Sequence, residues 1–166
     1  MIELIVLDVD GTMTNGKIIY STTGEELKGF CVKDGLAIVT WQKLGKRVAI
    51  ITGRKSSIVE NRANELKIEF LYQKIKNKDE KVEEILEKLN LTWDNVAVIG
   101  DDLNDYTMFK KAKYGFAPSD ASSYIKDIAT HILEKRGGEA AVREMIEHLV
   151  KLEGLEEEFV NIWVAK

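Results

Sequence analysis

The chain alternates between short runs of branched apolar residues and longer stretches in which apolar residues recur every three or four positions. Short, mostly apolar runs occupy residues 2–7, 48–52 and 96–100. Runs this short and this rich in Val and Ile are typical of strands that are covered on both faces of a parallel sheet. We therefore expect three buried strands at these positions.

Amphipathic segments lie between the apolar runs and predict helices. Apolar side chains in residues 78–89, for example, recur with the 3.6-residue period of a helix. Asp34, and either Ser56 or Ser57, are residue types that commonly cap a helix start. Helices are expected at residues 34–44, 56–66, 78–89, 104–111 and 138–152. This alternation predicts an α/β fold with a doubly wound parallel sheet, in a single domain spanning residues 1–166.

Residues 16–32 depart from the alternation and predict a β-hairpin. Two strand-like segments, 17–20 and 26–32, flank a turn sequence rich in Ser, Thr and Gly. Because this hairpin follows the first strand directly, we expect it to project over the site as a flap. The chain has no insertion long enough to form a separate lid domain. The site would therefore be open unless a neighbouring subunit helps to close it.

The tail, about residues 154–166, has an acidic patch followed by an apolar segment. This pattern fits an edge strand or a helix that docks on the core of the same chain. It fits equally well an arm that packs on another subunit.

Two carboxylates, Asp8 and Asp10, stand two residues apart just beyond the first predicted strand. Residues at positions i and i+2 of an extended chain point to the same side, and open α/β sheets bind ligands beyond the carboxyl ends of their strands. Like charges this close repel each other unless a cation or a proton intervenes. Asp10 followed by Gly11 is also a common turn pair, so this segment alone does not establish a site.

A second acidic cluster follows the third predicted strand and changes the interpretation. Asp101, Asp102 and Asp105 lie there, and Thr52 ends the second strand. Because the carboxyl ends of parallel strands meet in one crevice, we expect these groups to converge with Asp8. Asp8, Asp101 and either Asp102 or Asp105 would suit Mg²⁺, which prefers oxygen ligands.

Composition limits the classes of partner. The net charge of −4 argues against nonspecific binding of nucleic acid. No stretch approaches the ~20 apolar residues that span a bilayer, and the N-terminus carries no pattern of a signal peptide. The single cysteine, Cys31, cannot form an internal disulfide and fits a reducing compartment. We expect a cytoplasmic protein that binds neither nucleic acid nor membranes.

The predicted arrangement has the parts that phosphoryl transfer to water requires. A nucleophilic Asp attacks phosphorus and becomes an aspartyl phosphate. Mg²⁺, a lysine such as Lys78, a Thr hydroxyl and backbone N–H groups offset charge on the equatorial oxygens. A second Asp donates a proton to the leaving alcohol and later takes one from the attacking water. A lone lysine in the first turn of a helix is more commonly a solvated residue, so Lys78 depends on this context.

The motifs themselves resemble a known family. Residues 8–14, Thr52-Gly53, Lys78 and residues 100–105 are similar, in order and spacing, to the four motifs of the haloacid dehalogenase superfamily. The resemblance implies that Asp8 is the nucleophile and a Mg²⁺ ligand. It implies that Asp10 is the general acid/base and gives its backbone carbonyl to the metal. The other implied roles are phosphoryl ligands for Thr52 and Lys78, a second metal carboxylate for Asp101, and support for Asp102 and Asp105.

The short flap and the segments 32–35, 51–54 and 135–144 resemble the capless branch of this superfamily. That branch contains the 3-deoxy-D-manno-octulosonate (KDO) 8-phosphate phosphatases of lipopolysaccharide precursor biosynthesis. Its members are tetramers in which the flap and the C-terminal segment of adjacent subunits help to enclose the site. The resemblance therefore implies a homotetramer acting on a sugar-acid phosphate. The implied substrate-binding residues are Lys33, Gly53, Arg54 and Arg136, with Arg54 facing the C1 carboxylate.

Two positions bear on the choice of sugar. Relatives that act on the nine-carbon KDN 9-phosphate tend to carry an acidic residue in place of Arg54 and a basic residue in place of Glu65. The eight-carbon substrate is favoured, with a KDN 9-phosphate or N-acylneuraminate 9-phosphate phosphatase as the alternative. The chain also departs from the family pattern at Asn77, because an Asp is usual before the lysine at position 78. If Lys78 is not the phosphoryl ligand, Lys81 is the alternative candidate for that role.

A different class of protein also places carboxylates, a Thr and a Lys at strand ends. Receiver domains carry a phospho-Asp as a signal, but their phosphorylated Asp lies on a later strand than their acidic pair. Here the Asp-x-Asp-Gly sequence is on the first strand and Gly-Asp-Asp on the third. This order disfavours a non-catalytic receiver-like module, and turnover of a phosphate ester would exclude it.

Overall fold

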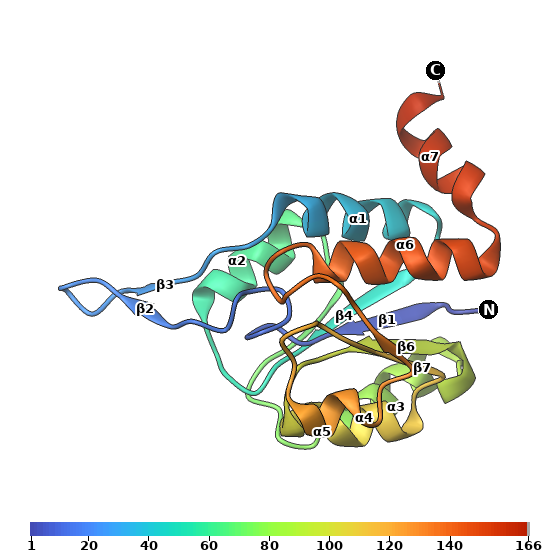
Figure 1. Cartoon of the computed structure of the whole chain (residues 1–166). Helices are drawn as coiled ribbons and strands as arrows, with labels where there is room; N and C mark the ends of the chain where they lie inside the picture. The colour runs from blue at the N-terminus through green and yellow to red at the C-terminus, as the bar shows by residue number, and fades with distance from the viewer. Residues whose placement is uncertain (166) are drawn as a thin grey trace.

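The structure, a computed structural model that describes residues 1–165, has three layers, with a parallel sheet between two layers of helices (Figure 1). The sheet has six strands in the order β5-β4-β1-β6-β7-β8, and every neighbouring pair is parallel. Its strands are β1 (Leu4–Leu7), β4 (Arg47–Ile51), β5 (Phe70–Tyr72), β6 (Val96–Ile99), β7 (Tyr114–Ala117) and β8 (His131–Ile132). The predicted doubly wound parallel sheet is confirmed.

Alternate residues of the central strand β1 face two separate cores. Ile5 and Leu7 pack with helices α1, α2 and α6, whereas Leu4 and Val6 pack with α3, α4 and α5. All four side chains are fully buried, and each such burial stabilises the fold by roughly 1.5–3 kcal/mol. The helices are α1 (Val32–Lys43), α2 (Ser57–Glu65), α3 (Lys78–Leu89), α4 (Tyr106–Lys111), α5 (Ser123–Lys126), α6 (Ala141–Glu153) and α7 (Glu156–Val164), with 3-10 turns at Trp93–Asn95 and Leu103–Asp105.

The helix boundaries confirm some of the predicted capping residues and correct one. The N-cap of α2 is Ser56, whose Oγ accepts a hydrogen bond from the Ile58 N–H at 3.2 Å. The prediction that Asp34 caps α1 is wrong, because α1 begins two residues earlier with Cys31 as its N-cap. Asp34 is buried in the first turn and accepts a hydrogen bond from the Arg143 N–H at 2.9 Å. It therefore joins α1 to α6 instead of starting a helix.

Other boundaries shift by a few residues. The predicted helix at 104–111 is a 3-10 turn, Leu103–Asp105, followed by α4, and the helix predicted at 138–152 begins at Ala141. The predicted strands correspond to β1, β4 and β6, whereas β5, β7 and β8 were not predicted.

The flap is a hairpin of two very short antiparallel strands, β2 (Ile19–Tyr20) and β3 (Glu26–Leu27). It extends from the end of the molecule where the sheet strands terminate, and its tip projects away from the body (Figure 1). The apolar side chains of Ile19, Tyr20 and Leu27 are exposed there. The hairpin prediction is confirmed, but paired strands are shorter than expected, and only the base of the hairpin approaches the chain's own site.

The tail forms α7, which lies on the chain's own helices. Phe159 is buried, and the Trp163 indole N–H donates a hydrogen bond to the Thr40 hydroxyl of α1 at 2.7 Å. The ammonium of Lys43 lies 4.1 Å from the centre of the Trp163 ring, a cation–π arrangement. The tail is thus a helix that contacts the core of its own chain, while Val160 and Val164 remain exposed and packing of the tail on another subunit stays a prediction. Residue 166 lies outside the described residues. Within residues 1–165, no helix combines the length and the apolar content needed to cross a membrane.

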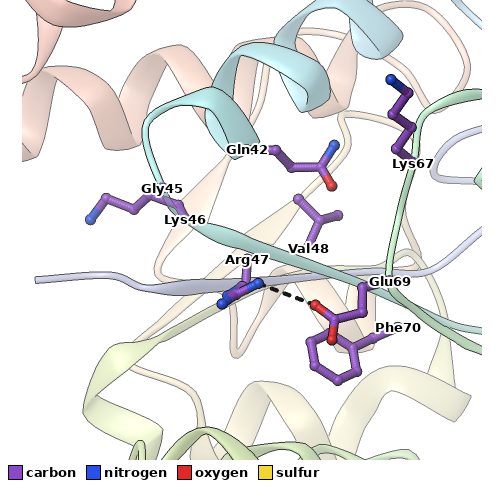
Figure 2. Close-up of a pocket in the computed structure, with 8 residues that line it drawn as sticks. All are labelled: Gln42, Gly45, Lys46, Arg47, Val48, Lys67, Glu69 and Phe70. Atoms are coloured by element: carbon purple, nitrogen blue, oxygen red, sulfur yellow. Dashed lines mark hydrogen bonds and ion pairs between the residues drawn. The ribbon is translucent and has the colours of Figure 1, made fainter.

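A shallow pocket lies at the amino-terminal ends of β4 and β5 (Figure 2). Arg47 and Glu69 form an ion pair across it at 3.2 Å, and both side chains are more than half exposed. In a parallel sheet this edge is opposite the carboxyl ends of the strands, where ligands bind. The pocket is therefore separate from the acidic residues that follow β1 and β6.

Candidate active site

The loop after β1 presents Asp8 at the end of the central strand. Asp8 is 3% exposed, and its N–H donates to the Ile99 carbonyl at 3.1 Å, which extends the pairing with β6. The chain then turns at Gly11, which has a φ of +90°. A Cβ at this glycine would lie 2.0 Å from Oδ2 of Asp101, so only glycine lets the loop pass so close to the second acidic segment.

Lys78, the first residue of α3, points inward and is fully buried. Its Nζ donates to Oδ1 of Asp8 and to Oδ1 of Asp105, both at 2.6 Å. Burying an ammonium group is costly unless carboxylates pair with it, and two of them do so here. Lys81 instead pairs with Glu84 on the surface. The structure therefore brings Lys78, and not the fallback Lys81, to the carboxylates.

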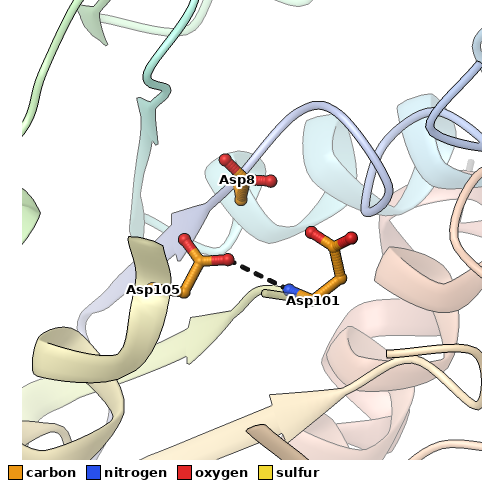
Figure 3. A group of neighbouring side chains, drawn as sticks. All are labelled: Asp8, Asp101 and Asp105. Carbon is orange, nitrogen blue, oxygen red and sulfur yellow. Dashed lines mark hydrogen bonds between the residues drawn. The ribbon is translucent and has the colours of Figure 1, made fainter. Parts of the chain in front are cut away.

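Asp105 organises the second acidic segment. Its Oδ2 accepts hydrogen bonds from the Asp101 N–H at 3.0 Å (Figure 3) and from the Asp102 N–H at 3.4 Å. Since its Oδ1 receives Lys78, both of its oxygens are engaged. Asp102 is exposed, and its Oδ1 accepts from the Leu103 N–H at 2.8 Å at the start of a 3-10 turn. Asp102 therefore caps this turn, and the carboxylates that lie together are those of Asp8, Asp101 and Asp105.

Carboxylate oxygens of Asp8, Asp101 and Asp105 lie within 4.8 Å of one another (Figure 3). Because the oxygens of Asp105 already accept from Lys78 and from backbone N–H groups, the geometry favours Asp8 and Asp101 as the pair that could hold a cation. A hard divalent ion such as Mg²⁺ suits this all-oxygen donor set.

The electrostatics of the cluster also fit a cation. Burial raises the pKa of Asp8 well above its usual range, repulsion from Asp105 raises it further, and Lys78 offsets only part of the effect. Burial, followed by repulsion from Asp105, raises the pKa of Asp101 to about 7. A bound divalent ion would favour the ionised form of both groups.

Lys78 itself remains a cation. Burial lowers the pKa of its ammonium group, but the carboxylates of Asp8 and Asp105 raise it by more, and the net shift is upward. A permanent positive charge thus sits beside the candidate nucleophile.

Asp10 lies at the rim and contacts the flap. Its Oδ1 accepts a hydrogen bond from Nζ of Lys28 at 2.5 Å. Lys28 also pairs with Oε1 of Glu26 at 3.1 Å, and the same oxygen receives Arg54 at 3.2 Å. Lys28 and Glu26 were not predicted as site residues. Their spacing was a usable signal, because residues i and i+2 of a predicted strand share a face.

The remaining predicted residues surround the cluster less closely. Thr52 is buried at the end of β4, whereas Gly53 and Arg54 beyond it are exposed. Lys33 is exposed near the start of α1, and Arg136 is exposed and lies 3.6 Å from a carboxylate oxygen of Asp120. Within residues 1–165, neither Lys33 nor Arg136 forms an ion pair with the carboxylate cluster.

Two glycines before α6 pack against the loop that follows β1 and carries Asp8. The Gly138 N–H donates to the Thr12 carbonyl at 3.0 Å. A Cβ at Gly137 would lie 1.8 Å from the Gly11 carbonyl oxygen, so no other residue fits at this contact. The segment that carries Arg136 is thereby fixed beside the loop that carries Asp8 and Asp10.

Comparison with known proteins supports the resemblance to the haloacid dehalogenase superfamily. Residues 68–146 match the model of a haloacid dehalogenase-like hydrolase family. The chain is 40% identical over 153 residues to the 3-deoxy-D-manno-octulosonate 8-phosphate phosphatase of Escherichia coli K12, an alignment that covers 92% of this chain and 81% of that protein.

Solved structures show the same similarity. A 3-deoxy-D-manno-octulosonate 8-phosphate phosphatase from Moraxella catarrhalis, in complex with magnesium, phosphate and KDO, superposes with a TM-score of 0.94 at 34% identity, covering 98% of this chain and 93% of that one. The cobalt-bound phosphatase from Haemophilus influenzae gives a TM-score of 0.88 at 33% identity, covering 92% and 90%. The chain therefore belongs to the 3-deoxy-D-manno-octulosonate 8-phosphate phosphatase family of haloacid dehalogenase-like hydrolases.

Proposed function

We propose that this chain is a Mg²⁺-dependent phosphatase that hydrolyses KDO 8-phosphate to KDO and phosphate, in lipopolysaccharide precursor biosynthesis. The observation that carries the proposal is the buried group at the end of β1 and β6, in which Lys78 joins Asp8 to Asp105 beside Asp101. The Escherichia coli relative bears the name of this activity, and the Moraxella structure contains magnesium, phosphate and KDO.

In the first step, an oxygen of Asp8 attacks phosphorus and the bond between phosphorus and the sugar oxygen breaks. Lys78 holds the other carboxylate oxygen at 2.6 Å, which fixes the orientation of the nucleophile. Asp10 donates a proton to the leaving sugar oxygen. The products of this step are the free sugar acid and an aspartyl phosphate on Asp8.

In the second step, Asp10 takes a proton from water as the water oxygen attacks phosphorus. The bond between phosphorus and Asp8 then breaks, which restores the carboxylate and releases phosphate. Lys78 and the hydroxyl of Thr52 bind phosphoryl oxygens in both steps. Asp8, Asp101 and the backbone carbonyl of Asp10 would hold Mg²⁺, which would supply positive charge to the phosphoryl oxygens in the transition state.

Recognition of the sugar acid is assigned to the rim. Arg54 is half-exposed, and its guanidinium suits the C1 carboxylate of the substrate, since paired hydrogen bonds to a carboxylate are strong. Gly53, Lys33 and Arg136 complete the proposed substrate-binding set. Glu65, which pairs with Arg62 at 2.9 Å, is an anion at the position where relatives with a nine-carbon substrate tend to carry a basic residue. A KDN 9-phosphate or N-acylneuraminate 9-phosphate phosphatase is the alternative.

We also propose that the chain works as a homotetramer in the cytoplasm, with residues 1–166 acting as one domain. The flap supports self-association, because a two-stranded hairpin is only marginally stable alone and this one exposes Ile19, Tyr20 and Leu27. A second copy that packs on the flap would cover these side chains. The net charge of −4 supports the proposed absence of nucleic-acid and membrane partners.

The experiment that tests the function is phosphate release, with Mg²⁺, from KDO 8-phosphate and KDN 9-phosphate measured side by side. We expect a strong preference for the eight-carbon ester and loss of activity with excess EDTA. A preference for the nine-carbon ester would contradict the substrate assignment while leaving the mechanism intact. Activity that EDTA does not affect would contradict the Mg²⁺ requirement, and sedimentation equilibrium would test the tetramer.

A further inference from the structure

The flap contains one residue whose environment differs from that of its neighbours. The side chain of Lys28 is only 1% exposed, although Leu27 and Gly29 beside it are exposed. Its ammonium lies between Oδ1 of Asp10 at 2.5 Å and Oε1 of Glu26 at 3.1 Å. Surface lysines usually keep a protein soluble, but a buried lysine at the base of a hairpin, held by two carboxylates, cannot serve that purpose.

The contact constrains Asp10 more than it constrains the flap. Asp10 lies in a loop, and its side chain is 23% exposed, so surrounding residues do not fully enclose its carboxylate. Lys28 is the hydrogen-bond partner of this side chain within residues 1–165, and it engages Oδ1. The other oxygen, Oδ2, remains available for proton transfer. Charge-assisted hydrogen bonds of this length are among the strongest that side chains form.

Resting on the proposed function, we infer that Lys28 is a positioning residue for the general acid/base Asp10. By holding Oδ1, it presents Oδ2 to the leaving sugar oxygen, and it makes proton donation depend on the flap being in place. Glu26 completes the arrangement, because its Oε1 forms ion pairs with both Lys28 and Arg54. The acid/base is thereby connected to the residue proposed to bind the substrate carboxylate.

A positioning role has a signature that other roles for Lys28 lack. A general acid matters most when the departing oxygen is strongly basic and little when it is stable as an anion. p-Nitrophenyl phosphate releases a stable anion, phenyl phosphate a more basic one, and KDO 8-phosphate an alkoxide. The two aryl esters lack the sugar carboxylate, so they report on the acid without any contribution from sugar binding.

The test is the Lys28→Met variant, measured as kcat/KM for these three esters with Mg²⁺. This parameter covers the steps up to loss of the alcohol, so the later activation of water by Asp10 does not enter it. We expect a loss of less than about threefold for p-nitrophenyl phosphate, at least ~10-fold for phenyl phosphate and ~100-fold for KDO 8-phosphate, within the range that general acids contribute. Retained turnover of p-nitrophenyl phosphate also shows that the variant is folded.

Lys17→Met is the matched control. Lys17 is exposed on the first arm of the same hairpin, and its replacement should change none of the three values. A double variant, Lys28→Met with Asp10→Asn, should lose no more activity on KDO 8-phosphate than Asp10→Asn alone, because the two residues act as one unit.

Three results would overturn the inference. Equal losses on all three esters would show that Lys28 only supports the fold. A loss confined to KDO 8-phosphate, with both aryl esters unchanged, would show that it binds the sugar. Losses of the single variants that multiply in the double variant would show that it acts independently of Asp10. A wild-type chain that released no phosphate from any ester would instead overturn the proposed function, and the inference with it.

Discussion

The buried cluster and the outer ion pair of the rim, Arg54 with Glu26, hold their charges in different ways. In the cluster, Lys78 and its two carboxylate partners are at most 4% exposed, and both ion pairs measure 2.6 Å. At the rim, Arg54 and Glu26 are 47% and 20% exposed and lie 3.2 Å apart. Water screens the rim pair, whereas the cluster pairs interact in a medium of low dielectric.

From this difference we expect the buried cluster to carry out the reaction and the rim to discriminate between substrates. A substrate carboxylate can replace Glu26 at Arg54, because an exposed pair contributes only about 0–1 kcal/mol. No comparable exchange is available to Lys78, since breaking a buried pair leaves an uncompensated charge. Changes in the cluster should therefore affect every substrate alike, and changes at the rim should depend on which substrate is offered.

The largest effect is expected from Asp8→Asn. The amide cannot act as the nucleophile, so kcat should fall by at least ~10⁴-fold for KDO 8-phosphate and for aryl phosphates alike. Phosphate release and thermal unfolding, measured together, check the result. Asp94→Asn, at an exposed carboxylate, is the control and should leave kcat unchanged. Full activity of Asp8→Asn would refute the mechanism.

Lys78→Met tests whether the cluster depends on its cation. Removing it leaves Asp8 and Asp105 buried without a partner, which should lower the free energy of unfolding by ~3–5 kcal/mol in the absence of Mg²⁺. We expect kcat to fall by about 10³-fold, because a charge on the phosphoryl oxygens is lost. Urea denaturation with Lys81→Met as the control measures the stability effect. An unfolding curve that matches the wild type would show that the cluster is not held by this lysine.

Arg54→Ala should give the substrate-dependent effect that distinguishes the rim. Loss of its hydrogen bonds to the C1 carboxylate should raise KM for KDO 8-phosphate by roughly 10–100-fold, with little change in kcat. KM for phenyl phosphate, which has no carboxylate, should not change. If both values of KM rise together, Arg54 acts on the phosphoryl group or on the fold instead.

The smallest effect is expected from a carboxylate outside both regions. Burial raises the pKa of Asp34 from its ordinary 3.8 to about 6, and the hydrogen bond from Arg143 offsets only part of this. Because the folded state binds this proton more tightly, Asp34 stabilises the protein below pH 4, and the contribution disappears as the pH rises to about 6. As the pH rises from 4 to about 6, the free energy of unfolding of Asp34→Asn minus that of the wild type should increase by ~1–3 kcal/mol. A difference that does not vary with pH would contradict the assignment.

The sequence predicted most of the cluster and little of the rim. Asp8 and Asp101 could be placed because strand ends converge wherever a parallel sheet forms, whatever the detail of each loop. Lys78, the first residue of α3, was identified from its resemblance to the family motif. The pairing of Lys28 with Asp10 depends on the path of a hairpin whose strands are only two residues long. Such a path is set by tertiary contacts that local sequence patterns do not encode.

The same reasoning explains the strands that were not predicted. β7 has four residues and includes Gly115, and β8 has only two residues. Both pair with an existing sheet, so neighbouring strands supply the stability that their own sequences lack. The N-cap of α1 was misplaced for a related reason, because Asp34 is a good capping residue by type but is drawn to the backbone of α6.

The contact of Gly137 and Gly138 with the loop after β1 has a consequence for synthesis of the protein. The loop after Asp8 leaves the ribosome well before the turn on which it packs, because that turn lies about 130 residues later in the chain. The site therefore cannot take its final shape until most of the chain has been made. Until then a growing chain would carry Asp8, the proposed nucleophile, without phosphatase activity, and a fragment that ends before Gly137 should bind neither metal nor phosphate at this site.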